Sequence, residues 1–452
     1  MRFMQGKDVV VAGGGPSGVV AAIAAARNGA DVMLIERYGF LGGMTTAGLV
    51  GPWMSFHSRD GAQVIEGIPQ EIVDRLVAEG GSPGHQRDTI GEAYSVTPID
   101  PETVKHVMEE MLLESGAHVL YHCWAVDALV QGGGLRGVVV QTKSGRVAIP
   151  STVTIDATGD GDVAAMAGAD FEFGEGESRS VQPVSLMFRL SGVDMECVRD
   201  YMIEHPEEFH HRSMIGDLRR IPLSGVSGFK SIWKEGQIQG AMNIGRGWFL
   251  FFQGLGETEV VVNSTRVASV DPTEFEDLTR AEIEARRQTW ALVKYMRAKL
   301  PGFSDSRLIQ TAPQIGVRES RRIVGQYSLT GDDVMSGRWF EDTVMVGGYS
   351  VDVHGSTAEN SKQVQVPAHC VPYRCLVPRD VDGLLVTGRA FSADRDALGA
   401  LRTTPGVMAM GQAAGTAAAL AVRDGVPTAD VSTDLLREKL RAQGAVVDLP
   451  GA

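Results

Sequence analysis

The sequence contains few cysteines, and they do not form a disulfide pattern. Its 452 residues include four cysteines spread along the chain, at Cys123, Cys197, Cys370 and Cys375. Proteins held together by disulfides carry more cysteines, and the C-x4-C spacing of the last two is not the C-x-x-C of thiol redox motifs. We therefore expect free thiols and a cytoplasmic protein.

Positive charge is also in short supply. Lys and Arg number 42 against 56 Asp and Glu, which gives a formal net charge of -14. Such a surface repels nucleic acid phosphates and anionic membranes. The apolar run 9–26 could be mistaken for a signal peptide, but three glycines and a proline at 13–16 interrupt it. The stretch 405–422 has no charged residue, but its Gly, Gln and Thr content argues against a membrane span. We expect no nucleic acid and no membrane partner.

Glycine, in contrast, is abundant, and several of the 55 glycines form a recognisable turn. The β-branched run 8–12 predicts a buried strand, 16–28 a helix and 32–35 a second strand. Between the first strand and the helix lies G-x-G-x-x-G, formed by Gly13, Gly15 and Gly18 with Pro16 and Ser17. In a βαβ unit these glycines permit a tight turn, a close approach to a pyrophosphate and close helix–strand packing, respectively.

An acidic residue at the end of the second strand completes this fingerprint. Glu36 follows the strand 32–35, where a carboxylate can accept hydrogen bonds from a ribose diol and repels a 2'-phosphate. A glycine turn beside a surface glutamate is the alternative interpretation. Strand, helix and acid together favour a dinucleotide site, which on this evidence could hold either NAD or FAD.

Further segments carry a family resemblance. Taken in order, they resemble FAD-dependent oxidoreductases related to the fumarate reductase and succinate dehydrogenase flavoproteins, over about residues 7–422. The matching segments are 41–51 (LGGMTTAGLVG), 155–162 (IDATGDGD), 317–323 (VRESRRI), 348–354 (GYSVDVH), 384–389 (LLVTGR) and 408–417 (MAMGQAAGTA). Several matches in one order are more specific than any single motif.

The resemblance implies an α/β fold in two parts. A Rossmann-like FAD-binding domain of the glutathione-reductase-like flavoprotein type would comprise 1–170 and 375–452, and an α+β substrate domain would be inserted at 171–374. Local patterns predict helices at 100–116 and 272–300. They predict strands at 118–129, 137–142, 146–149, 184–190, 248–253 and 382–387.

The resemblance also implies a set of FAD-contacting positions. FAD is expected to be noncovalent, because 41–51 contains no His, Cys or Tyr for attachment. The helix after Pro405 would direct its positive end toward the flavin pyrimidine edge, where a reduced flavin carries negative charge. The expected positions are Gly13, Gly15, Pro16, Ser17, Gly18, Glu36, Arg37, Gly42, Gly43, Met44, Thr45, Val126, Ala157, Thr158, Gly159, Gly388, Arg389, Gly406 and Val407.

Catalytic candidates come from the inserted domain, which in the family covers the reacting face of the flavin. We select His354, Arg318 and Tyr349, with Asn263 and Arg266 as further candidates. The alternatives are a solvated charge cluster for the arginine run and a structural histidine oriented by Asp352. No metal is expected, because His205, His210 and His211 show no ligand spacing typical of a metal site.

These observations predict an FAD-dependent dehydrogenase, oxidase or reductase that transfers a hydride between a small organic substrate and flavin N5. A flavin monooxygenase is the alternative enzyme, since Asp160-Gly161 echoes a hydroxylase motif, although Thr387-Gly388-Arg389 lacks the Gly-Asp pair usual there. A non-catalytic binding protein on the same fold is a third possibility. The sequence leaves the substrate and electron acceptor open and is compatible with a homo-oligomer.

Overall fold

A parallel sheet forms the centre of the molecule. The computed structural model describes residues 1–210, 212–355 and 360–449. The parallel strands run in the order β7-β3-β2-β10-β22. Their bounds are β2 Lys7–Ala12, β3 Val32–Ile35, β7 His118–Leu120, β10 Gly145–Asp156 and β22 Leu384–Val386. Strands from near both ends of the chain therefore share one sheet.

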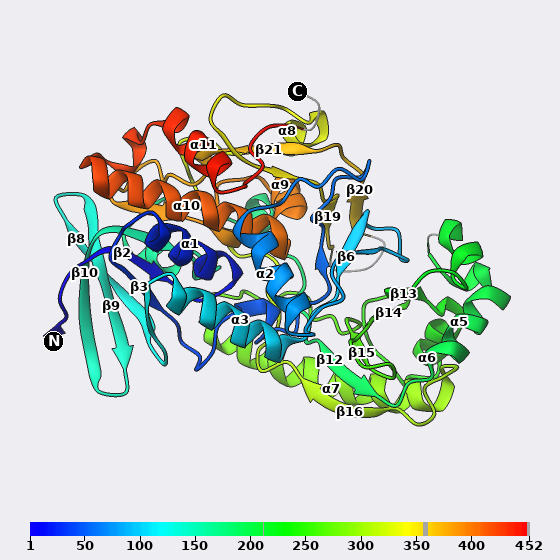
Figure 1. Cartoon of the computed structure of the whole chain (residues 1–452). Coiled ribbons are helices and arrows are strands. Elements are labelled where there is room, and N and C mark those ends of the chain that lie inside the picture. The colour runs from blue at the N-terminus through cyan, green and yellow to red at the C-terminus, as the bar shows by residue number, and fades with distance from the viewer. Residues whose placement is uncertain (211, 356–359, 450–452) are drawn as a thin grey trace.

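Two helices pack in parallel on one face of this sheet. Val9 and Val11 of β2 face α1 (Pro16–Arg27) and α10 (Thr404–Asp424), which lie side by side in Figure 1. A Cβ at Gly411 would lie 2.2 Å from the carbonyl oxygen of Ser17, and one at Gly415 would lie 2.1 Å from that of Ala21. Because both contacts advance in the same direction, the two helices direct their N-termini toward the same edge of the sheet.

An antiparallel meander covers the other face. Val10 and Ala12 pack against β8 (Trp124–Gln131), β9 (Gly134–Thr142), the first half of β10 and α4 (Asp162–Met166). The strand expected over 118–129 is divided into β7 and β8. His122, between them, adopts a left-handed backbone conformation with φ 55°, which turns the chain out of the parallel sheet and into the meander.

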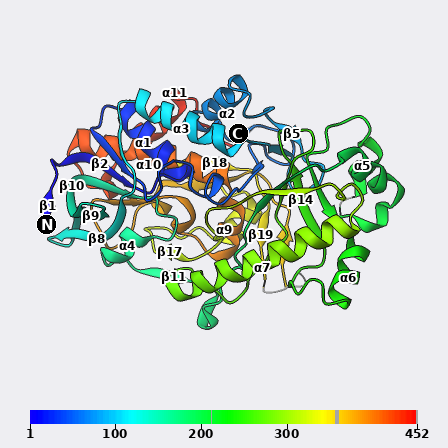
Figure 2. The same ribbon diagram turned by 90° about the horizontal axis from the view of Figure 1, so that it is seen from below.

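A second, antiparallel sheet lies at the opposite end of the molecule from the meander (Figure 1). Its order is β13-β14-β15-β12-β16, with α5, α6 and α7 packed against it, and α7 runs along the lower side of the molecule (Figure 2). The bounds are β12 Phe188–Ser191, α5 Met195–Glu204, β13 Gly225–Gly228, α6 Lys230–Ile238, β14 Phe249–Gln253, β15 Val260–Val262, α7 Phe275–Lys299 and β16 Arg307–Thr311.

The strand expected over 184–190 begins later than its sequence pattern suggests. Regular pairing starts only at Phe188, whereas Val184 and Ser185 form single bridges to Val267 and Gly316. The helix expected over 100–116 spans Pro101–Glu114, and the side chain of Asp100 caps it by accepting a hydrogen bond from the Thr103 backbone N–H at 2.9 Å.

Segments late in the chain also pack in the core of α1 and α10. Leu329, Val344, Val351 and Cys375 belong to this core, so the segment before residue 375 supports the first sheet as well. The division at 170/171 and 374/375 stays a prediction. The remaining bounds are β1 Arg2–Phe3, β4 Trp53–Met54, α2 Ile68–Ala78, β5 Gln86–Arg87, β6 Ser95–Thr97, β11 Phe171–Phe173, β17 Arg321–Ile323, α8 Gly331–Ser336, β18 Thr343–Gly347, β19 Val351–Val353, β20 Lys362–Val364, β21 His369–Pro372, α9 Arg395–Leu401 and α11 Thr433–Ala442.

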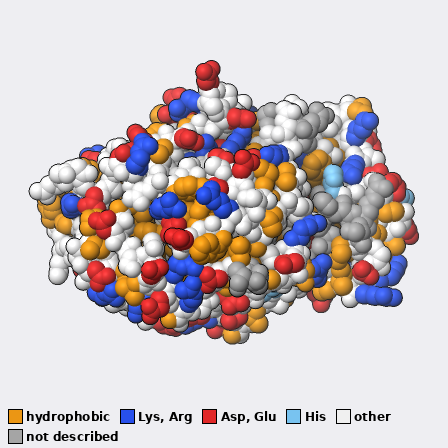
Figure 3. Space-filling model, turned by 90° about the horizontal axis from the view of Figure 1, so that it is seen from above, with side chains coloured by type: hydrophobic (Ala, Val, Ile, Leu, Met, Phe, Trp, Pro, Cys, Tyr) orange, Lys and Arg blue, Asp and Glu red, His pale blue; other side chains and the backbone are white. Residues whose placement is uncertain are grey.

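Helix α10 is long and apolar enough to cross a membrane, but its surroundings are protein. Of its most apolar window, 89% is buried inside the molecule. Its small residues pack on α1, as described above. On the face shown in Figure 3, acidic and basic side chains are intermixed with apolar ones. Its apolar composition is therefore explained by its position in the protein core.

Candidate active site

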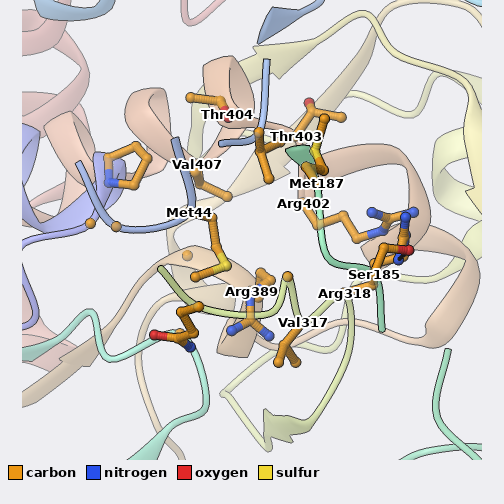
Figure 4. Close-up of a pocket in the computed structure, with 18 of the residues that line it drawn as sticks. Met44, Ser185, Met187, Val317, Arg318, Arg389, Arg402, Thr403, Thr404 and Val407 are labelled. Atoms are coloured by element: carbon orange, nitrogen blue, oxygen red, sulfur yellow. Dashed lines mark hydrogen bonds between the residues drawn. The ribbon is translucent and has the colours of Figure 1, made fainter. Parts of the chain in front are cut away.

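A cavity of about 490 Å³ lies between the two parts of the fold. On one side it is lined by the glycine turn after β2, the end of β3 and the start of α10. On the other it is lined by residues of β14 and of the segment around Arg318. Figure 4 shows Met44, Val407, Arg389 and Arg402 converging on it from both sides. The carboxyl edge of a parallel sheet is where α/β proteins bind ligands.

The three fingerprint glycines meet three different environments. Gly13 has φ 104°, and a Cβ there would lie 2.5 Å from the carbonyl oxygen of Ala157. A Cβ at Gly18 would lie 1.9 Å from the carbonyl oxygen of Gly13. At Gly15 the nearest atom to an added Cβ is Cα of Gly43, at 3.9 Å, and Gly15 lines the cavity. The space at the α1 N-terminus is therefore a cradle that fits a phosphate group.

Glu36 is held in the cavity wall by two backbone amides. It is 5% exposed, and its carboxylate accepts hydrogen bonds from the N–H groups of Gly14 at 2.6 Å and Tyr38 at 2.9 Å. Burial raises the pKa of its carboxyl group, and these two hydrogen bonds oppose the rise. Each carboxylate oxygen retains a lone pair that can accept a ribose hydroxyl.

Arg389 contributes a partly unsatisfied cation to the same half of the cavity. Its Nη2 donates to Asp160 at 3.1 Å, while its Nη1 is buried without a partner among the described residues. Figure 4 shows this side chain near Met44 and Val317. A buried guanidinium N–H without an acceptor is costly, and an anionic oxygen of a nucleotide can satisfy it. The donor set thus fits FAD.

Most of the expected FAD positions line this cavity. They are Gly13, Gly15, Pro16, Ser17, Glu36, Arg37, Gly43, Met44, Ala157, Thr158, Gly159, Gly388, Arg389 and Val407. Val126 is not among the lining residues, whereas the two residues before it, Trp124 and Ala125, are.

Four other expected positions lie behind the wall and shape it. Gly18 packs α1 against the glycine turn, and the Gly42 N–H donates to the carbonyl oxygen of Gly14 at 2.9 Å. Thr45 is buried and its hydroxyl accepts a hydrogen bond from the Trp53 indole at 3.0 Å. A Cβ at Gly406 would lie 2.8 Å from the carbonyl oxygen of Leu401.

The opposite half of the cavity gathers arginines. Figure 4 shows Arg318 and Arg402 close together beside Ser185. Nη1 of Arg318 donates to the carbonyl oxygen of Pro183 at 2.8 Å and to the Ser185 hydroxyl at 2.9 Å. Burial, together with the nearby charges of Arg402 and Arg266, lowers the pKa of Arg318 to about 9, so it remains a cation at neutral pH.

An aspartate and a histidine form a pair next to these arginines. Nε2 of His354 lies 3.1 Å from a carboxylate oxygen of Asp352, and Nη2 of Arg402 donates a hydrogen bond to the same oxygen at 3.1 Å. Burial alone would raise the pKa of Asp352, but His354, Arg402 and Arg318 hold it below its usual range. Burial lowers the pKa of His354 to about 4, against the opposing effect of Asp352. A neutral ring that donates Nε2–H to Asp352 keeps its lone pair on Nδ1.

The third catalytic candidate, Tyr349, also lines the cavity, as do Asn263 and Arg266. Tyr349 is 6% exposed, and burial raises the pKa of its hydroxyl well above the usual value. It therefore stays protonated at neutral pH, so its hydroxyl can donate a hydrogen bond to a ligand but does not serve as a base.

Sequence reasoning missed several charged residues of the cavity, among them Glu92, Arg246 and Arg402. Arg246 stands in Gly245-Arg246-Gly247 directly before an apolar strand, and Arg402 closely precedes Pro405 at the helix start. A charged residue in such a place can signal a site. Glu92 follows a glycine in a loop, and no local pattern distinguishes it.

The remaining arginines of the run 318–322 have structural partners. Arg321 pairs with Asp162 at 2.8 Å, and Arg322 pairs with the fully buried Glu319 at 2.8 Å. Arg322 does not line the cavity, and neither does Arg321. Arg321 and Arg322 thus form ion pairs within the protein, as the alternative interpretation of a charge cluster expects, whereas Arg318 lines the cavity.

The histidines considered for a metal do not form a site. Within the described part of the chain, no group of three or more His, Cys, Asp or Glu residues could hold a metal ion. His205 lies 3.6 Å from Glu207, and His210 packs against Trp248 with ring centroids 4.4 Å apart. His211 lies outside the described residues.

Part of the sequence is similar to that of a known protein. Thiamine thiazole synthase from Methanococcus maripaludis is 27% identical over 164 residues, which is 34% of this chain and 55% of that protein. The chain thus spans about half the length of that relative.

The structure is similar to two solved structures, of which the first shares its fold. A myxobacterial FAD-dependent halogenase, chondrochloren halogenase, has a TM-score of 0.51 at 14% identity, covering 98% of this chain and 79% of that one. A geranylgeranyl bacteriochlorophyll reductase-like protein from Thermoplasma acidophilum has a TM-score of 0.49 at 15% identity, covering 99% and 85%.

The family comparison covers nearly the whole chain. The sequence model of the FAD dependent oxidoreductase family matches residues 8–440, which include the glycine turn, the arginine cluster and α10. The protein belongs to the FAD dependent oxidoreductase family and is an enzyme that uses FAD.

Proposed function

We propose that this enzyme transfers a hydride between a carbon atom of a small anionic organic substrate and FAD. The observation that carries the proposal is the neutral His354, oriented by Asp352 and placed with Arg318 and Arg402 in the cavity that also contains the dinucleotide cradle. Bound FAD supplies the two-electron chemistry. The chain supplies proton transfer and charge stabilisation.

His354 provides the proton-transfer group. When the substrate is oxidised, Nδ1 accepts the proton that leaves the substrate heteroatom, and Asp352 stabilises the imidazolium that results. In the reverse direction the same nitrogen returns the proton. Because the ring is 24% exposed on the cavity side of the fold, a substrate can reach it.

Arg318 and Arg402 provide fixed positive charge. A guanidinium holds a carboxylate or a developing enolate through its planar fork and stays charged during the reaction. Both side chains are already fixed by hydrogen bonds, Arg318 to Ser185 and Arg402 to Asp352, so they need little reorganisation to stabilise charge.

The start of α10 supports the electron-transfer step. Thr403, Thr404 and Val407 line the cavity at the N-terminal end of this 21-residue helix. A helix N-terminus stabilises nearby negative charge by about 0.3–2 kcal/mol. This end of the helix therefore favours a cofactor that gains negative charge on reduction.

The proposal is tested by anaerobic single-turnover flavin reduction with a panel of small organic acids, alcohols and amines. We expect His354→Gln to retain its flavin and to slow reduction by about 100- to 10,000-fold, the usual effect of losing an acid–base group. Exposed His106 on α3, the helix Pro101–Glu114, offers the control His106→Gln, which should behave as the parent. Equal reduction rates in parent and His354→Gln would contradict the assignment.

The pH dependence of this step has a defined direction. The step needs the neutral ring, whose pKa is lowered to about 4, so the rate should be constant above that value and fall as the pH decreases through it. An ordinary histidine would lose activity near pH 6.5. If no substrate reduces the flavin without oxygen, the monooxygenase alternative gains support instead.

A further inference from the structure

Arg246 is a buried cation without a partner. It lies between α6 and β14, is 7% exposed and lines the cavity. Its Nε is buried without a hydrogen-bond partner, and no hydrogen bond or ion pair joins its guanidinium to any residue that the structure describes. The guanidinium lies over the Trp248 ring, 5.6 Å from the centroid.

The other arginines of the cavity differ in this respect. Arg318 donates to Pro183 and Ser185, Arg402 donates to Asp352, and Arg389 donates to Asp160. Burying a guanidinium without compensation is strongly unfavourable, because its charge and its five N–H donors lose water. A chain that retains such a group at a cavity surface is organised to receive an acceptor from outside.

Neither of the nearest carboxyl groups neutralises Arg246. Glu92 forms no ion pair with it within 4.0 Å, and burial together with the charges of Asp352 and Asp88 raises the pKa of Glu92 to about 8. Glu92 is therefore largely uncharged at neutral pH. Asp352 is ionised, but it is engaged by His354 and Arg402.

Large apolar side chains follow Arg246 in the chain and line the same cavity. Trp248, Leu250 and Phe252, on and just before β14, line the cavity beside it, and the His210 ring packs against Trp248. Aromatic faces of this kind bind planar apolar groups. The surroundings of Arg246 thus combine one uncompensated positive charge with a surface suited to a planar body.

We propose that Arg246 anchors an anionic group of the substrate, a carboxylate or a comparable oxyanion, and that the adjoining planar apolar part of the substrate lies against Trp248 and Phe252. This inference rests on the proposed function and narrows its substrate class. The substrate then reaches from Arg246 toward His354, with its anionic group separate from the reacting atom. Arg318 and Arg402, which have partners of their own, serve the reacting end.

The side chain of Arg246 can be changed without disturbing its backbone contacts. The Trp233 indole and the Gln237 amide donate to the backbone carbonyl of Arg246, not to its guanidinium. Arg246→Met keeps a long, unbranched side chain and removes the buried charge. If the charge serves a ligand and not the fold, this variant should unfold at the same temperature as the parent or a higher one.

The experiment measures binding to the oxidised holoenzyme by isothermal titration calorimetry and by flavin difference spectra. The probes are benzoate, a planar anion, and benzamide, its neutral isostere. We expect benzoate to bind the parent at least tenfold more tightly than benzamide. Arg246→Met should weaken benzoate binding at least tenfold and should do so more than Arg318→Met. Exposed Arg287 on α7 offers the control Arg287→Met, which should leave binding unchanged.

Several results would overturn the inference. They are the absence of benzoate binding to the parent, equal affinities for benzoate and benzamide, and unchanged benzoate affinity in Arg246→Met. A loss of affinity confined to Arg318→Met would place the anion at the other arginines and would also overturn it. Because the titration uses resting enzyme and needs no turnover, its outcome is separate from the flavin-reduction test of the proposed function.

Discussion

Gly15 differs from the other glycines of its loop in the space around it. Gly13 and Gly18 are required by the protein itself, because a Cβ at either would collide with backbone atoms, whereas the protein leaves Gly15 open. Its φ of -70° and ψ of 178° are accessible to any residue. We therefore expect that any requirement for glycine at this position comes from the cofactor and not from the fold.

Gly15→Val is expected to fold and to lose FAD, because the branched side chain fills the phosphate cradle. The flavin-to-protein absorbance ratio after purification measures the loss, and circular dichroism measures the fold. Gly18→Val is the informative comparison, since it should fail to fold stably. A Gly15→Val protein that purifies with a full complement of FAD would show that the cradle is elsewhere.

Elements of secondary structure were predictable where local patterns dominate. The βαβ unit at 7–35 and the capped helix at 101–114 depend on turn glycines, an N-terminal proline and a capping aspartate, all of which act over a few residues. The strand expected at 184–190 was partly wrong. Its first residues bridge to two distant segments, and such pairing leaves no mark on the local sequence.

The contact between α1 and α10 leaves no room for a side chain at Gly415. Gly415→Ala would place a methyl group 2.1 Å from the carbonyl oxygen of Ala21, so the helices must separate. We expect a loss of about 1–3 kcal/mol in the free energy of unfolding, the usual cost of overpacking. Urea denaturation measures it.

Gly216→Ala is the matched control for that substitution, because an added Cβ at Gly216 meets no atom within 4 Å. The control should leave the denaturation midpoint almost unchanged. Equal stability of Gly415→Ala and the parent would mean that α1 and α10 are not in the contact described.

At the scale of the whole molecule, FAD is expected to hold the two parts of the fold together without a covalent bond. The cavity is lined by both parts, so bound FAD stabilises only the folded arrangement, by about 2.7 kcal/mol at a ligand concentration 100 times Kd. Adding FAD to the apoenzyme should therefore raise the Tm.

Acid precipitation of the holoenzyme should release all of the yellow colour, because FAD is expected to be bound without a covalent link. Colour retained in the pellet would indicate a covalent link.

The sequence by itself determined the part of the cavity that surrounds the glycine turn. Its strand, glycine turn, helix and acid lie within residues 7–36, and the physical demands of phosphate binding act on neighbouring residues, so they leave a readable local pattern. His354 and Arg318 were also selected from the sequence and both line the cavity, but they were selected only because they stand in segments that resemble a family.

Tertiary structure alone decided which residues form the half of the cavity opposite the glycine turn. Glu92, Arg246, Asp352 and Arg402 come from four distant segments and meet in one cavity. Their burial and mutual charges set the ionisation states of Glu92 and His354, and the partners of Arg318 and Arg402 leave Arg246 uncompensated. These properties depend on desolvation and on distances through space, and a linear sequence contains neither.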